Sequence, residues 1–104
     1  MQDLIGSETS ELERVFEALV ETWRHETAAL SSVHQQAIHP AYQRIIGLGP
    51  AAVPLLLREL RDRPEHWFWA LNAITGEDPA VATTRFEDAV HAWLDWGRSR
   101  GHLD

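Results

Sequence analysis

The sequence predicts an all-α fold, a compact five-helix bundle, and three observations lead to it. Apolar residues recur at three- and four-residue spacing in five separate stretches, which is the period of an α-helix. Gly and Pro stand between these stretches, where helices commonly end and begin. No alternating run of four or more residues is bounded by hairpin turn residues, so a β-sheet is not expected.

The first predicted helix runs from Ser10 to about Glu26. Ser10 and Glu13 have the spacing of a capping box, in which two side chains satisfy free amides at the start of a helix. Residues 1–6 are expected to be a frayed or disordered N-terminus. The apolar stripe of this helix comprises Leu12, Val15, Phe16, Leu19, Val20 and Trp23.

The middle of the chain predicts two short helices. Residues 28–38 have weak periodicity, and the sequence leaves open whether they form a loop or an irregular helix. A helix is predicted over residues 40–46, with Gly47 ending it in the left-handed conformation. Pro50 then opens a helix that extends to about residue 61. Their inward residues are predicted to be Tyr42, Ile45, Ile46, Val53, Leu56, Leu57 and Leu60.

Two further helices complete the predicted bundle. Residues 64–75 are apolar nearly all round and end at Gly76, so this helix is expected to be the most buried element. Thr84 and Glu87 form a second capping box, which opens a last helix that ends near Arg100. Its core face is predicted to comprise Phe86, Val90, Trp93, Leu94 and Gly97.

Length and composition limit the class of protein. A chain of 104 residues suits one core, so residues 7–101 are predicted to form a single helical domain, followed by a C-terminal tail at 102–104. The chain has no Cys, which excludes disulfides and thiolate chemistry and favours a reducing compartment, the cytoplasm. Neither a signal peptide nor a membrane-spanning segment is expected, because no apolar run is long enough.

The charge is strongly acidic. The formal net charge is −7, and all nine basic residues are Arg, which suggests a GC-rich bacterial genome. Residues 1–30 hold seven acidic residues and two Arg, a local net charge of −5. Such a surface repels a phosphate backbone, so nucleic acid is not an expected partner, whereas a basic protein is. The simpler interpretation is a solvated helix face.

Part of the chain resembles a known repeat family. Residues 45–60, IIGLGPAAVPLLLREL, resemble the turn and second helix of a HEAT-type repeat, and residues 68–78, FWALNAITGED, and 93–96 resemble the end of bacterial HEAT-like domains. Over residues 39–79 the chain is similar to short, uncharacterised bacterial all-helical proteins. The resemblance implies HEAT-like helix pairs with protein-binding surfaces and brings no catalytic residues. Only one repeat is clear, whereas a solenoid needs about three.

Aromatic residues supply the predicted binding surface. Trp67 and Trp69 lie about 200° apart on a helix, so one of them should leave the shared core face. Trp93 and Trp96 can share a face, with Trp96 at the edge of the core; burial of every Trp is the alternative. Trp and Arg dominate binding hot spots. The predicted partner-binding residues are Trp69, Trp96, Arg98, Arg100, Glu13, Glu17 and Glu21.

The sequence therefore predicts a non-enzymatic protein-interaction module, such as an acidic inhibitor or antitoxin-like partner of a basic protein. Self-association into a homodimer through the same face is compatible with this interpretation. The alternative is a small ligand-binding protein or enzyme. Its pocket would use Ser31, Ser32, His34, His39 and His66, although Ser-rich loops with a nearby His more often form caps and turns.

A metal site and a cofactor are not predicted. None of the six His falls in a zinc-binding spacing such as HExxH. Pairs four residues apart could each offer two ligands from one helix face, but such pairs also arise as ordinary surface contacts. These pairs are Glu21 with His25, Glu87 with His91, and His91 with Asp95.

Overall fold

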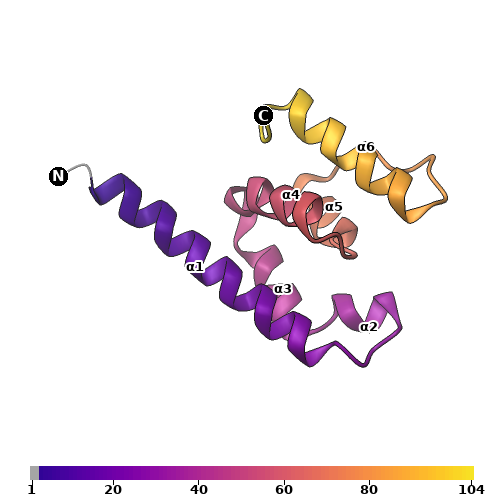
Figure 1. Ribbon diagram of the computed structural model, residues 1–104, viewed down its shortest axis with the longest axis horizontal. Coiled ribbons are helices and arrows are strands. Elements are labelled where there is room, and N and C mark those ends of the chain that lie inside the picture. The colour runs from indigo at the N-terminus through magenta and orange to yellow at the C-terminus, as the bar shows by residue number, and fades with distance from the viewer. Residues whose placement is uncertain (1–2) are drawn as a thin grey trace. The chain divides into compact units, whose positions relative to one another are not determined.

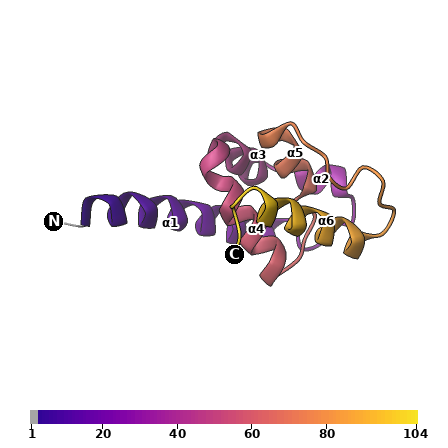
Figure 2. The same ribbon diagram turned by 90° about the horizontal axis from the view of Figure 1, so that it is seen from above.

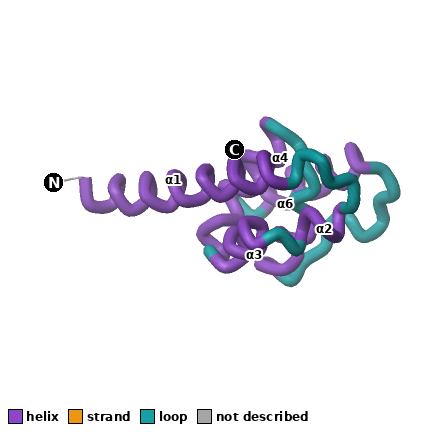
Figure 3. Tube along the Cα trace, turned by 90° about the horizontal axis from the view of Figure 1, so that it is seen from below, coloured by secondary structure: helices purple, strands orange, loops and turns teal. Residues whose placement is uncertain are grey.

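The structure is a computed structural model that describes residues 3–104, with side chains from residue 11 onward. These residues form six α-helices and one 3-10 helix and contain no strand (Figures 1 and 3). The all-α prediction is confirmed, and the structure has six α-helices where the sequence predicted five. Contacts divide the chain into two compact units, Met1–Gly47 and Leu48–Asp104. A single domain over residues 7–101 stays a prediction.

The first unit is built on one long helix. Helix α1 spans Asp3–Glu26 and packs against α3, which spans Pro40–Gly47. Its N-terminal turns extend past the other helices of this unit (Figures 1 and 2). The predicted start at Ser10 is wrong, because the helix is already continuous there and the capping-box spacing falls inside it. Of the segment expected to be frayed, residues 3–6 are helical, and residues 1–2 lie outside the described residues.

Trp23 joins the three helices of the first unit. Its side chain is buried, and its indole N–H donates to the Gln36 carbonyl oxygen at 2.7 Å. Its ring centroid lies 5.8 Å from that of Tyr42 on α3. The predicted α1 stripe is mostly confirmed, since its buried members are Phe16, Leu19, Val20 and Trp23, whereas Leu12 and Val15 are half-buried.

The segment that the sequence left open is a turn followed by a short helix. Helix α2 spans Val33–Ala37. Ser32 is its N-cap, and the Ser32 hydroxyl oxygen accepts a hydrogen bond from the Gln35 amide at 3.2 Å. Polar side chains in this segment therefore satisfy backbone groups at a helix start.

The second unit is built around α4. A 3-10 helix, Gly49–Ala52, leads into α4, Val53–Asp62, which contacts both α5, Phe68–Thr75, and α6, Phe86–Ser99. The prediction that residues 64–75 form the most buried element is wrong, because one side of α5 faces solvent. The fully buried leucines of α4 are Leu56, Leu57 and Leu60.

Three predicted helix boundaries differ from the structure. Helix α5 begins at Phe68 and not at Pro64, because the chain first makes a tight turn that buries Trp67 at the N-cap position. Helix α6 begins at Phe86, with Arg85 as N-cap, so Thr84 does not cap it. Its first turn carries Glu87 and Asp88, whose charges favour a helix N-terminus without a capping hydroxyl. The 3-10 turn delays α4 to Val53.

The left-handed turn after α3 lies two residues later than predicted. Gly49 has a φ of 79°, whereas Gly47 remains in the helix. A residue before Pro avoids the right-handed helical region, and Gly49 precedes Pro50. Glycine can adopt the positive φ of this turn without the steric cost that a side chain would add. The predicted stop at Gly76 is confirmed, with a φ of 72° at the C-cap.

Close packing of α4 against α6 requires Gly97. A Cβ atom at this position would lie 2.7 Å from Leu57 Cδ1, well inside contact distance. The predicted C-terminal tail also returns to this point, since the amides of His102 and Leu103 donate to the Gly97 carbonyl oxygen at 2.8 and 3.3 Å. Helix α4, helix α6 and the C-terminal tail thus meet at Gly97. Among the described residues, no helix has the length and hydropathy to cross a membrane.

Candidate functional site

The predicted acidic surface lies on one face of α1. We define the α1 acidic face as Glu13, Glu17 and Glu21, which follow one another at four-residue spacing and share a side of the helix. Glu17 and Glu21 are exposed, and Glu13 is half-buried. Glu11, two residues before Glu13, forms an ion pair with Arg14. The face therefore presents carboxylates to solvent on the helix that extends past its unit.

Helix α5 presents an uncharged face to solvent. Trp69 is 45% exposed, whereas Trp67 is fully buried, which confirms that one of the two leaves the core. Asn72, Ala73 and Gly76 are exposed at the helical spacing that places them beside Trp69. No Asp, Glu, Lys or Arg occurs from residue 66 to residue 76. This face offers an aromatic contact without a charge to desolvate.

Trp96 is engaged by its own chain. Its ring lies 5.2 Å from Trp93 and stacks on His102 at 5.4 Å, and the Arg100 guanidinium lies 5.3 Å from its centroid. Arg100 also contacts Glu77 at 3.4 Å. The predicted cluster of Trp96 and Arg100 therefore exists, but Trp96 is half-buried within it. Arg98 is exposed and pairs with Asp95 at 3.1 Å.

The Ser and His residues of the alternative pocket are divided between the two units. Ser31, Ser32, His34 and His39 belong to the first unit, where Ser31 and His34 are exposed and Ser32 caps α2. His66 belongs to the second unit, where its ring lies 4.9 Å from Phe86.

His39 uses both ring nitrogens in structural contacts. Its Nδ1 accepts a hydrogen bond from the Ala41 amide at 3.0 Å, so in the neutral ring the proton is on Nε2. Nε2 lies 2.8 Å from Glu26 Oε1 and donates to it. The side chain therefore caps the start of α3 and ties it to the end of α1. A catalytic base needs a free nitrogen directed at a substrate, and this geometry provides none.

The cap predicts a stability effect for His39. The substitution His39→Ala should lower the free energy of unfolding by about 0.5–2 kcal/mol, the usual cost of losing an N-cap acceptor. His39→Asn should retain most of the stability, because Asn also caps through a side-chain oxygen. Urea denaturation followed by circular dichroism measures both variants. Equal losses for Ala and Asn would contradict the capping role.

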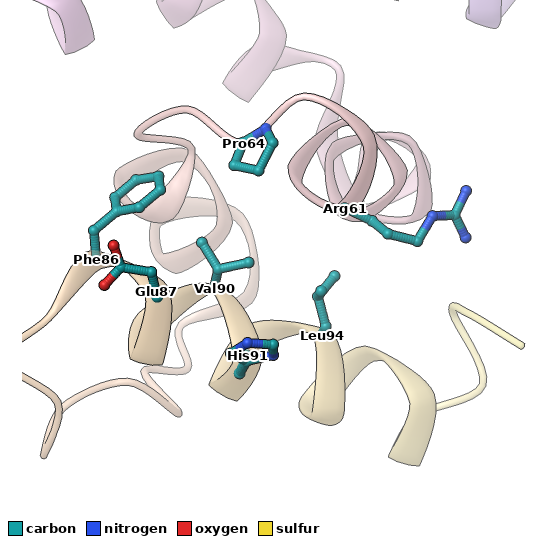
Figure 4. A pocket seen from close by; sticks show the side chains of 7 residues that line it. All are labelled: Arg61, Pro64, Phe86, Glu87, Val90, His91 and Leu94. Atoms are coloured by element: carbon teal, nitrogen blue, oxygen red, sulfur yellow. The ribbon is translucent and has the colours of Figure 1, made fainter.

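A groove between α6, the end of α4 and the following loop was not predicted from the sequence. Its volume is about 280 Å³. In Figure 4, Phe86, Val90 and Leu94 extend from α6 towards α4 and Pro64. The signal that could have found it is the pair Glu87 and His91, which borders this apolar stripe. The lining residues are Arg61, Pro64, Phe86, Glu87, Val90, His91 and Leu94.

The charges around the groove are unevenly placed. The Arg61 guanidinium is directed away from the groove in Figure 4 and bonds to Asp62, with Nε 2.8 Å from Oδ1. This hydrogen bond lowers the pKa of the Asp62 carboxyl from its usual value. The Glu87 side chain is 67% exposed and lies 3.5 Å from Arg85. Across the described residues, no cluster of three His, Asp or Glu side chains is arranged to hold a metal ion.

Comparison of the chain with protein-family models, curated proteins and solved structures finds no match in any of the three. The HEAT-like resemblance of residues 39–79 therefore stays a prediction.

Proposed function

We propose that this chain is a non-enzymatic protein-interaction module that binds a basic protein through the α1 acidic face. The observation that carries the proposal is the exposure of Glu17 and Glu21 on the part of α1 whose other side buries Phe16, Val20 and Trp23. Carboxylates on the exposed side of a packed helix can reach a partner without rearrangement of the unit. The net charge of −7 adds long-range attraction for a cationic surface.

Apolar contact would complement this electrostatic attraction. The α5 face supplies Trp69, and exposed Trp side chains are over-represented among binding hot spots. Charged groups at an interface mainly raise the association rate, whereas buried aromatic contacts slow dissociation. An inhibitor or antitoxin-like partner of a basic toxin or nuclease fits this division of roles. The Ser and His residues support an enzyme less well, because Ser32 and His39 already cap helices.

The test compares charge variants of the tagged chain in a pull-down from the source organism at moderate salt. The triple variant Glu13→Gln, Glu17→Gln, Glu21→Gln should reduce recovery of the partner at least about threefold, because exposed charge pairs contribute about 0.2–1 kcal/mol each. Raising the salt concentration should weaken the wild-type complex in the same direction. Mass spectrometry identifies the partner, and surface plasmon resonance gives its association rate.

A matched control makes the same charge change elsewhere. Asp78→Asn, Asp95→Asn and Asp104→Asn remove three exposed carboxylates of the second unit. This control should keep most of the binding. Recovery that is indifferent to salt and to the α1 substitutions, or that falls equally in the control, would refute the proposed function.

A further inference from the structure

The groove of the second unit has the dimensions of a pocket for one side chain. Its floor is apolar, formed by Phe86, Val90, Leu94 and Pro64, and its volume is about 280 Å³. Sites for drug-sized molecules enclose most of the ligand and span about 300–1,000 Å³. A smaller groove that is open on one side suits a protruding apolar side chain of a protein, the usual anchor of an interface.

The charge at the groove favours a cationic neighbour for that side chain. Glu87 is exposed and its contact with Arg85 is solvent-screened, so an incoming ammonium or guanidinium group can replace Arg85 at little cost. Asp88 is exposed one residue further along α6. The single cation among the lining residues, Arg61, contributes its aliphatic stem, because its guanidinium is directed away and bound to Asp62 (Figure 4).

We propose that this groove binds a Leu-sized side chain that is flanked by Lys or Arg in a segment of the partner protein. The apolar group would lie against Phe86 and Pro64, above the nearly buried Val90 and Leu94, and the flanking cation would pair with Glu87. This inference rests on the proposed function, since it specifies which kind of segment the basic partner presents. It assigns binding to residues of α6 that are separate from the α1 acidic face and from the α5 face.

Synthetic peptides test the groove without knowledge of the partner. The probe is acetyl-Lys-Lys-Leu-Lys-Lys-amide, titrated into the full ¹⁵N-labelled chain and followed by amide chemical shifts. Shift changes should cluster at residues 61–64 and 86–94. A peptide with Ala in place of Leu should bind at least about fivefold more weakly, because each buried methylene contributes about 0.8 kcal/mol. A peptide with Glu in place of every Lys should also bind at least about fivefold more weakly.

Charge reversal in the protein provides a second test of the groove. Glu87→Lys changes an exposed side chain and leaves Asp88 in the first turn of α6. Because Glu87 also favours the start of α6, circular dichroism must first show that the variant keeps its helix content. Glu87→Lys should then weaken the Lys-flanked peptide and strengthen the Glu-flanked one, each about threefold or more. A control, Asp95→Lys, makes the same reversal on α6 outside the groove and should leave both affinities nearly unchanged.

The two proposals fail in different ways. Absence of shift changes at the groove, equal affinity for the Leu and Ala peptides there, or no response to Glu87→Lys would overturn the groove inference. If the α1 triple variant still lost its partner, the proposed function would stand. Peptide binding at the groove would support its preference for a Leu side chain flanked by Lys. If the partner were at the same time indifferent to salt and to the α1 substitutions, the proposed function would be refuted.

Discussion

Replacing Trp23 with Ala is expected to lower the free energy of unfolding by about 3–5 kcal/mol, the usual cost of removing a buried Trp side chain. Trp23 is 2% exposed and connects α1 to α2 and α3. The truncation also leaves the Gln36 carbonyl without its indole donor, which adds a desolvation cost. For a chain of this size, the loss is a large part of the total stability. Urea denaturation monitored at 222 nm measures the change.

Trp23→Phe separates packing from hydrogen bonding. Phe keeps much of the aromatic contact with Tyr42 but cannot donate to Gln36, so it should cost about 1–3 kcal/mol, clearly less than Ala. Adding Gln36→Ala should not restore stability, because the acceptor is a backbone oxygen. A loss below about 1 kcal/mol for Trp23→Ala would show that Trp23 does not hold the first unit together.

Gly97→Val should lower the free energy of unfolding by about 1–3 kcal/mol, because it inserts side-chain atoms where α6 touches Leu57. Leu57 Cδ1 would lie 2.7 Å from the new Cβ, so the buried Leu57 side chain must shift within the core to accept it. Gly97→Ala should cost less, since Ala gains up to about 1 kcal/mol of helix propensity over Gly. Thermal and urea denaturation measure both variants.

A double-mutant cycle identifies the clash. Leu57→Ala alone should be destabilising by about 2–5 kcal/mol, because it leaves a cavity. Combined with Gly97→Val, part of the cavity is filled, so the double variant should be more stable than the sum of the single effects by about 1 kcal/mol or more. Additive effects would show that Gly97 and Leu57 do not constrain each other. Ala89→Val, on the same helix away from Leu57, is a control that should add with Leu57→Ala.

The five helices that periodicity predicts are all present in the structure, which adds the short helix α2, whereas their starts required tertiary information. The α4 leucines repeat at helical spacing around a single core, and the structure buries them as predicted. Ser10 and Thr84 share the capping-box spacing, yet neither begins a helix. Such a spacing occurs by chance within helices and loops. The burial of Trp67, which delays α5 to Phe68, depends on residues distant in sequence.

The candidate site was predictable where exposure follows from helix geometry. The opposite orientations of Trp67 and Trp69 follow from 100° per residue, and the structure confirms them. The contacts of Trp96 with Arg100 and His102 were only partly predictable, because the turn at Gly101 folds His102 back onto the ring. The groove was missed because Val90 and Leu94 look like ordinary core residues in the sequence. The structure does bury them, and the groove forms above them only because Phe86 and Pro64 remain accessible at its edges.

The unequal burial of the Trp residues gives this protein an intrinsic optical reporter. All five Trp lie in the described part of the chain, and Trp23, Trp67 and Trp93 are almost completely shielded from solvent. Trp69, by contrast, is 45% exposed on α5. A collisional quencher such as iodide should therefore act mainly on the red-shifted emission of Trp69, and to a smaller extent on the half-buried Trp96. Any molecule that covers the α5 face will protect the Trp69 fluorescence from quenching, so its binding can be followed without a label.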